Sequence, residues 1–214
     1  MIAPDGLKLI YTTTIIFLVL LIITYFFPIT TLKIITTVIG VIFLFNFFFL
    51  RDPERNIPQG NHLILSPADG TVIKIEEAEE PYFFKQKVKK VSIFLSVFNV
   101  HVNRIPVSGK VEFFKYIEGK FFAAFEDKAS ENNEQTVIGI NNTKGKLLFK
   151  QIAGIIARRI VCTISEGDSV KAGDRCGLIR YGSRVDMFFP QNVELKIKIG
   201  EKVTGGESII GEFQ

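Results

Sequence analysis

Residues 166–179 read EGDSVKAGDRCGLI, and the same outline returns at residues 199–213 as IGEKVTGGESIIGEF. Each segment contains a turn, a valine, a second glycine turn and then an apolar run. Glycine turns between short apolar runs are typical of strands joined by tight connections. The pair therefore indicates a weak internal repeat within a β-structured domain.

The chain before and between these repeats is also strand-like, because its runs alternate or are rich in β-branched residues. The runs are TVIKIEE, KVSIFLSVFNVHVNRI, GKVEFFKYI, TVIGINN, KLLFKQIAG, RRIVCTI, CGLIRYG and VELKIKI. Only residues 121–129 suggest a short helical turn. Similar repeats recur in the flattened β-sandwich of biotinyl and lipoyl carrier domains. We therefore predict a mainly β fold for residues 56–214, a compact β-sandwich or barrel-sandwich-like domain with biotinyl/lipoyl-like half repeats.

The N-terminal part differs, since residues 9–27 and 34–50 contain no charged side chain. Each run is about as long as a helix that crosses a hydrocarbon core of roughly 30 Å. Pro28 falls between them, so residues 1–55 are predicted to form a transmembrane helical hairpin. Lys8 before the runs and Arg51 after them favour a cytoplasmic location for both ends. We expect the cell membrane as the location, with the β-domain on its cytoplasmic side; a hairpin that dips into one leaflet stays an alternative.

Few residues suggest metal or redox chemistry. The chain has 214 residues, a formal net charge of +4, two cysteines and two histidines. Cys162 and Cys176 lack C-x-x-C spacing and are predicted to be core thiols in a reducing compartment. His62 and His101 are too isolated for a familiar zinc motif. We expect no metal and no nucleic-acid partner.

Three polar residues stand out against the apolar strands. Ser183 follows Gly182 in RYGSRVDMFFP, Asp69 lies in SPADG, and His101 lies in FNVHVNR. Each has an ordinary explanation as a turn residue, a turn cap or a structural histidine. A hydroxyl, an imidazole and a carboxylate are also the set that activates a serine nucleophile. Strand alternation places His101 on one face with Asn99 and Asn103, but spacing does not show that the three groups meet.

Six motifs carry a resemblance to a known family: FFFLRDPERNIP, SPADG, FNVHVNRIP, SENNEQ, QIAGIIARRI and RYGSRVDMFFP. Together, and in this order, they resemble the short membrane-anchored form of the phosphatidylserine decarboxylase family, from about Phe47 to the C-terminus. The long form often has Leu-Gly-Ser-Thr where this chain has Tyr-Gly-Ser-Arg. It also has a second histidine where this chain has Arg104. Both differences are similar to the short form.

The resemblance implies self-cleavage between Gly182 and Ser183. The products would be a β chain of residues 1–182 and an α chain of residues 183–214, which stay together. Ser183 would become a pyruvoyl group that forms a Schiff base with the substrate, and His101, paired with Asp69, would act as the base. The implied reaction converts phosphatidylserine in the membrane to phosphatidylethanolamine without a metal or pyridoxal phosphate.

Several points stay open at this stage. The lipid tails could be ether-linked, which would make the enzyme an archaetidylserine decarboxylase, and a homo-oligomer is left open. A membrane-tethered carrier or adaptor without activity is a different class, but Gly182 and Ser183 stand where a carrier needs a lysine. A serine hydrolase lacks its G-x-S-x-G elbow here. Arg180 and Arg184 are expected to be solvated strand ends more than oxyanion or phosphate partners.

Overall fold

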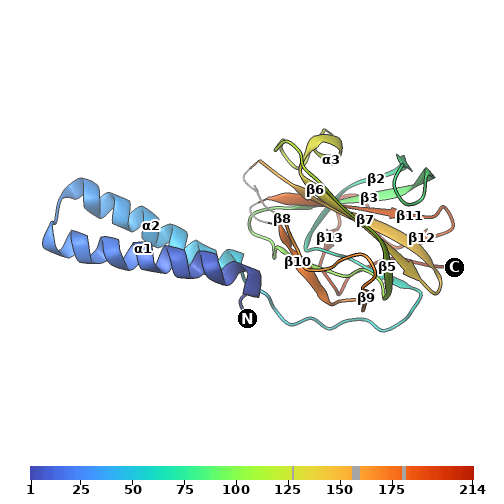
Figure 1. Ribbon diagram of the computed structural model, residues 1–214, viewed down its shortest axis with the longest axis horizontal. Coiled ribbons are helices and arrows are strands. Elements are labelled where there is room, and N and C mark those ends of the chain that lie inside the picture. Colours follow the sequence, from blue (N-terminus) through green and yellow to red (C-terminus); the bar gives the residue numbers. More distant parts are fainter. Residues whose placement is uncertain (127, 156–159, 180–181) are drawn as a thin grey trace. The chain divides into compact units, whose positions relative to one another are not determined.

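The computed structural model describes residues 1–126, 128–155, 160–179 and 182–214. The chain divides into two compact units, Met1–Glu54 and Arg55–Gln214. Helices make up the first unit and strands dominate the second (Figure 1). The predicted mainly β fold with an N-terminal helical hairpin is confirmed.

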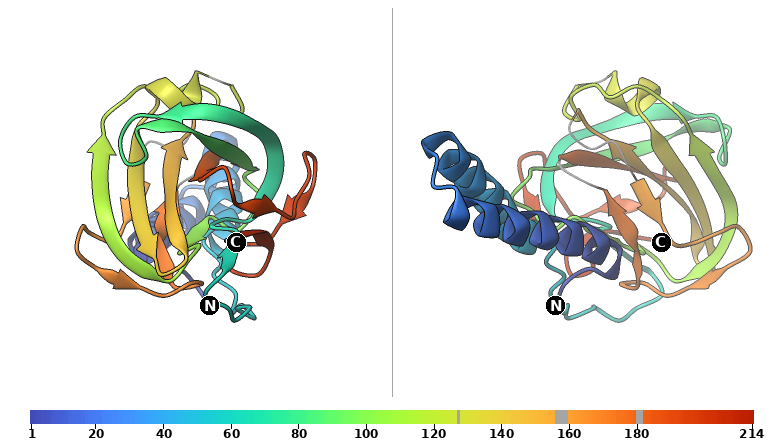
Figure 2. Two further views of the ribbon diagram at one scale, coloured as in Figure 1. Left: turned by 90° about the vertical axis from the view of Figure 1, so that its right-hand side faces the viewer. Right: turned by 60° about the vertical axis from the view of Figure 1, so that its left-hand side comes forward.

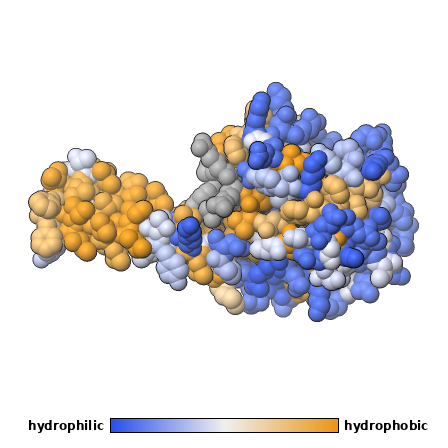
Figure 3. Space-filling model, in the orientation of Figure 1, coloured by the Kyte–Doolittle hydropathy of each residue, from blue (hydrophilic) through white to orange (hydrophobic). Residues whose placement is uncertain are grey.

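The first unit is a pair of apolar helices. A short 3-10 helix, η1 (Pro4–Gly6), leads into α1 (Leu7–Phe26), and α2 (Thr30–Phe49) follows the break at Pro28. Both helices are long and apolar enough to cross a membrane. Their visible surface is almost entirely apolar (Figure 3). The helices share a polar contact, because the hydroxyls of Thr24 and Thr36 lie 2.7 Å apart.

The second unit is built from short strands. Their bounds are β1 (Leu63–Leu65), β2 (Gly70–Glu80), β3 (Gln86–Leu95), β4 (Val102–Arg104), β5 (Gly109–Ile117), β6 (Gln135–Asn142), β7 (Gly145–Ala153), β8 (Ile160–Cys162), β9 (Ser169–Val170), β10 (Arg175–Ile179), β11 (Ser183–Phe189), β12 (Glu194–Leu195), β13 (Lys202–Val203) and β14 (Ile209–Glu212). One short helix, α3 (Ala129–Asn132), interrupts the described strands. The helical turn thus falls on the SENNEQ motif, later than residues 121–129 suggested.

The sheets have a two-fold internal order. Among the described residues, the large sheet runs β13-β2-β3-β11-β7-β6-β5-β9, and the small sheets run β1-β14-β12 and β4-β10-β8. If β2 is exchanged with β5, β3 with β6, β11 with β7 and β13 with β9, the strand order of the large sheet is the same when read from its opposite edge. Exchanging β1 with β4, β14 with β10 and β12 with β8 turns one small sheet into the other. The large sheet curls strongly, as Figure 2 shows.

The predicted half repeats are the basis of this symmetry. In one repeat, Gly200 donates from its backbone N–H to the carbonyl of Val72 (2.7 Å), and Val72 donates to Glu201 (2.9 Å). In the other, Gly167 donates to Val111 (2.8 Å), and Val111 donates to the carbonyl of Asp168 (2.9 Å). Gly200 and Gly167 have φ values of 87° and 96°, a left-handed conformation that glycine adopts at no steric cost.

The two symmetric halves are not consecutive in the chain. One half contains β4 to β10, and the other contains β1 to β3 together with β11 to β14. The half β4–β10 is therefore inserted between β3 and β11, which pair with each other as a hairpin would. The chain enters this insertion after Leu95 and leaves it before Ser183, whose Cα atoms are register partners. The entry and exit segments are consequently brought side by side.

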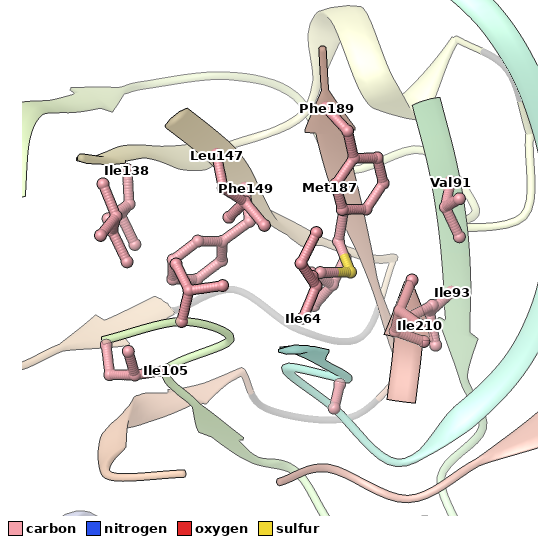
Figure 4. Close-up of a cluster of buried hydrophobic side chains, with 14 of the residues drawn as sticks. Ile64, Val91, Ile93, Ile105, Ile138, Leu147, Phe149, Met187, Phe189 and Ile210 are labelled. Atoms are coloured by element: carbon pink, nitrogen blue, oxygen red, sulfur yellow. The ribbon is translucent and has the colours of Figure 1, made fainter. Parts of the chain in front are cut away.

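The curled sheet encloses the hydrophobic core. Val185, Met187 and Phe189 point inward from β11 and contact residues such as Phe149 and Ile93, all of them buried (Figure 4). Alternation along the strand sends Arg184 and Asp186 to the opposite face. Burial of this inner face supplies the main driving force for folding of the unit.

The opposite face of β11 carries a buried charged network. The Asp186 carboxylate accepts hydrogen bonds from Arg184 Nε (2.6 Å) and from the Ser130 hydroxyl (2.5 Å), and lies 3.4 Å from Lys90 Nζ. Arg184 also donates to the Ser92 hydroxyl at 2.8 Å. The expectation of a solvated strand end at Arg184 is therefore wrong, because this side chain is only 1 % exposed and ion-paired. Arg180 lies outside the described residues.

The run KVSIFLSVFNVHVNRI forms two strands rather than one. β3 ends at Leu95, and Asn99 closes a turn in which its Oδ1 accepts from the backbone N–H and the hydroxyl of Ser96 (2.9 and 2.8 Å). Asparagine favours such turns because its side chain replaces a backbone partner. The predicted shared face of Asn99, His101 and Asn103 is therefore wrong, since only Asn103 lies within β4.

Both cysteines carry free thiols, as predicted. Cys176 is buried and Cys162 is half-buried. Burial raises the pKa of both thiols, most strongly that of Cys176. Thiols of this kind stay protonated and unreactive at neutral pH.

Replacement of Asp186 tests the buried network. Asp186→Ala leaves Arg184 and Lys90 without their shared partner, and we expect a loss of about 3–5 kcal/mol in unfolding free energy. Glu77→Ala is the control, because the Glu77–Lys87 pair (3.4 Å) is exposed and such pairs contribute about 1 kcal/mol or less. Denaturant unfolding of the detergent-solubilised chain measures both. Equal losses would contradict a structural role for the network.

The same network predicts an acid limit of stability. Burial raises the pKa of Asp186, but the charges of Arg184 and Lys90 and the bound donors outweigh it and hold the pKa below its ordinary value. A carboxyl group whose pKa is lower in the folded state stabilises the fold at pH values above its unfolded-state pKa, which is about 3.9. This stabilisation is lost as the pH falls through the folded-state pKa. The wild-type melting temperature should therefore fall more steeply below about pH 4 than that of Asp186→Ala.

Candidate active site

Ser183 begins β11 in the interior of the β-unit. It pairs with Leu95 of β3 on one side and Ala153 of β7 on the other. The side chain is fully buried, and its hydroxyl has no hydrogen-bond partner in the part of the chain that the structure describes. A buried hydroxyl without a partner costs free energy, so its retention in the core indicates a chemical use.

Gly182 places an unusual backbone next to this hydroxyl. Its φ of 73° lies in the left-handed region, which disfavours side-chain-bearing residues. The carbonyl oxygen of Gly182 lies so close to Gly154 that a Cβ atom added to Gly154 would stand 2.3 Å from it. Both residues must be glycine for the carbonyl of residue 182 to occupy this position.

His101 reaches the backbone nitrogen of Gly182 from the entry segment. Its Nε2 lies 3.3 Å from the backbone nitrogen of Gly182, which donates to it, and its Nδ1 lies 3.0 Å from the carbonyl oxygen of Asn99. These partners fit a neutral imidazole with the proton on Nδ1 and the lone pair of Nε2 facing Gly182. The structure therefore brings His101 to the backbone nitrogen of Gly182, the residue that precedes Ser183.

Asp69 lies on the turn between β1 and β2. Arg55 Nη2 lies 2.9 Å from both carboxylate oxygens, and Gly205 donates its backbone N–H to one of them at 2.8 Å. This turn lies against β4, because Arg104 donates its backbone N–H to the carbonyl of Pro67 at 2.8 Å. The hydrogen bonds described for Asp69 go to Arg55 and Gly205, so its pairing with His101 stays a prediction.

Sequence reasoning assigned no role to Arg55 or to the SENNEQ motif. Asn133 of that motif donates to the carbonyl of Ala153 (2.7 Å) and exchanges hydrogen bonds with the backbone of Phe122 (2.8 and 2.9 Å). The backbone N–H of Ala153 in turn donates to the carbonyl of Glu134 at 2.9 Å. Asn133 and Glu134 thus fix the chain directly before Gly154. Their only signal in the sequence was an amide and a carboxylate within a family motif.

An apolar groove opens beside the Gly182 peptide. It has a volume of about 360 Å³ and is lined by Phe94, Ser96, Val97, Ala123, Ala124, Phe125, Ile155 and Gly182. Ser96 is the one polar side chain among these residues, and its hydroxyl is bonded to Asn99. The described residues include no group of three or more His, Cys, Asp or Glu side chains that could hold a metal ion.

Comparison with known proteins agrees with this geometry. The model of the family described as Phosphatidylserine decarboxylase matches residues 42–211. The phosphatidylserine decarboxylase proenzyme of Syntrophus aciditrophicus is 51% identical over 171 residues, covering 79% of this chain and 80% of the relative. That of Chlorobium chlorochromatii is 41% identical over 213 residues, covering 100% of both chains.

The relatives that the chain matches define the class of protein, a lyase. The chain belongs to the phosphatidylserine decarboxylase family, and it is an enzyme of the carboxy-lyase class. Its relatives are described as proenzymes, which are made as longer precursors.

Proposed function

We propose that this chain converts phosphatidylserine to phosphatidylethanolamine with a pyruvoyl group that it makes from Ser183. One observation carries the proposal: the buried hydroxyl of Ser183 has no partner among the described residues and directly follows Gly182, whose backbone N–H donates to Nε2 of His101. A pyruvoyl group fits this site because it would be made from Ser183 itself and would stay attached to the chain there, so no separate binding residues are needed for it.

The first step is an acyl shift at the scissile peptide. The Ser183 oxygen attacks the carbonyl carbon of Gly182 while His101 Nε2 accepts the hydroxyl proton. The C–N bond then breaks, the Ser183 nitrogen gains a proton, and an ester joins the two residues. With a φ of 73° and no Cβ atom, Gly182 leaves its carbonyl open to attack.

The second step separates the chains. Removal of the Ser183 Cα proton expels the Gly182 carboxylate, and water then replaces the resulting imine nitrogen, which leaves as ammonia. Residues 1–182 end in an ordinary carboxylate, and residues 183–214 begin with the ketone. β11 stays bound because it is paired on both sides, with β3 and with β7.

The remaining residues suit a lipid substrate. When present, the pyruvoyl group supplies an electron sink for loss of carbon dioxide from an amino acid head group. His101, bonded to the backbone N–H of Gly182, would move a proton at the reacting carbon. The apolar groove beside Gly182 can accept the lipid side of the substrate. Asp69 would orient His101, and the apolar helices would hold the enzyme in the cell membrane with the β-unit on the cytoplasmic side.

Intact mass spectrometry of freshly purified protein tests the cut. We expect two species, residues 1–182 and a ketone-bearing species of residues 183–214. Ser183→Ala should stay full-length and inactive, and His101→Ala should be processed more slowly by about 10²-fold or more. Ser165→Ala, which changes an exposed serine, serves as the control. An active wild-type preparation that contains one full-length chain would refute the proposal.

A second prediction concerns the room for the Gly182 carbonyl. In Gly154→Ala the new methyl group displaces this carbonyl, and a misplacement near 1 Å is expected to slow cleavage by about 10²-fold or more. Gly109→Ala is the matched control, because its Cβ would stand 2.2 Å from the carbonyl oxygen of Asn141, at the other end of β7.

Both variants should show the far-ultraviolet circular dichroism of a folded chain. A time course of intact mass compares their processing rates. If Gly154→Ala is processed at the rate of Gly109→Ala, the close approach to Gly182 has no role in cleavage.

A further inference from the structure

Exposed apolar side chains of the β-unit gather around the groove beside Gly182. Among the described residues from Arg55 onward, the large exposed hydrophobic side chains are Phe98, Tyr116, Phe121, Phe125, Ile155 and Ile199. Phe125 and Ile155 line the groove, and Phe98 and Phe121 lie within two residues of its lining residues Val97 and Ala123. We call Phe98, Phe121, Phe125 and Ile155 the apolar rim.

The rim is too exposed to serve the core. Phe125 is 64 % exposed although its ring makes an edge contact with Phe94, 6.1 Å between centroids. Phe98 is 68 % exposed and Ile155 is 57 % exposed. Single exposed hydrophobic residues are ordinary, but a concentration of them at the mouth of one groove marks an interaction surface. On the face that Figure 3 shows, hydrophilic side chains cover most of this unit, with apolar patches between them.

The position of the rim in the chain identifies its partner. The exposed charges around Phe121 and Phe125 have both signs, Lys120 and Lys128 together with Glu118 and Glu126. Aromatic rings among charged side chains suit the interface of a bilayer, where rings enter the acyl region and charges stay at the level of the head groups. The two apolar helices that precede this unit in the same chain keep it near such a surface.

We propose that the apolar rim inserts into the surface of a phospholipid bilayer, as a membrane contact separate from the helical hairpin. The groove at Gly182 then opens into the lipid, so a diacyl substrate need not leave the bilayer to reach residue 183. This inference extends the proposed function, but the contact itself does not depend on the decarboxylase chemistry.

The absence of tryptophan from the chain allows a direct test. Phe125→Trp and, across the groove, Ile155→Trp each place one reporter on the rim of the full-length protein. Tyr116→Trp is the matched control, since Tyr116 is 49 % exposed but outside the rim. Each variant is reconstituted in vesicles of phosphatidylcholine and phosphatidylglycerol, with or without acyl chains brominated near the head group.

We expect the rim tryptophans to emit at shorter wavelength and to lose most of their emission to the brominated lipid. The control should keep its emission. Equal quenching at all three positions, or none at the rim, would overturn the proposal. If the emission of the rim tryptophans changes with the ratio of protein to lipid but not with bromination of the lipid, the surface binds a second copy of the chain, and the proposal is wrong. A failure of the pyruvoyl chemistry would leave these results unchanged.

Discussion

Pairing of β11 with β3 is the interaction on which the rest of the β-unit depends. These strands are the two ends of a hairpin whose turn has been replaced by a whole half of the fold, β4 to β10. Their register places Ser183 opposite Leu95. The entry segment, with His101, and the exit segment, with Gly182, must therefore meet, and hydrogen bonding between them follows from topology.

This arrangement also explains how a polar site survives inside a core. β11 presents Val185, Met187 and Phe189 to one side and a neutralised charge cluster around Asp186 to the other. Both sides are buried, so the strand start is held firmly although the Ser183 hydroxyl has no partner among the described residues. The packing of the strand offsets the free energy that such a buried hydroxyl costs.

Much of the fold could be predicted from the sequence because it rests on local patterns. Charge-free helices, alternating strands and the paired glycine turns at Gly167 and Gly200 are visible in short windows. The break at Asn99 was missed, since an apolar alternation runs through residues 90–105 and only the side-chain hydrogen bonds to Ser96 end the strand. The meeting of His101 with Gly182 depends on pairing between segments about eighty residues apart. No local pattern contains that information, nor the contacts of Asn133 and Gly154.

The inserted half gives the molecule two polypeptide links between its halves. One is the segment after Leu95, and the other is the segment before Ser183. In the symmetry-related hairpin, β6 and β7 are joined by a short turn at Asn142–Gly145 that no insertion interrupts. Two covalent links and the strand pairing all hold the halves together. Once the strands have paired, either link can therefore be broken without separating the halves. The proposed cut falls on such a link, so the enzyme would obtain its reactive group from a part of the backbone that the folded state no longer needs.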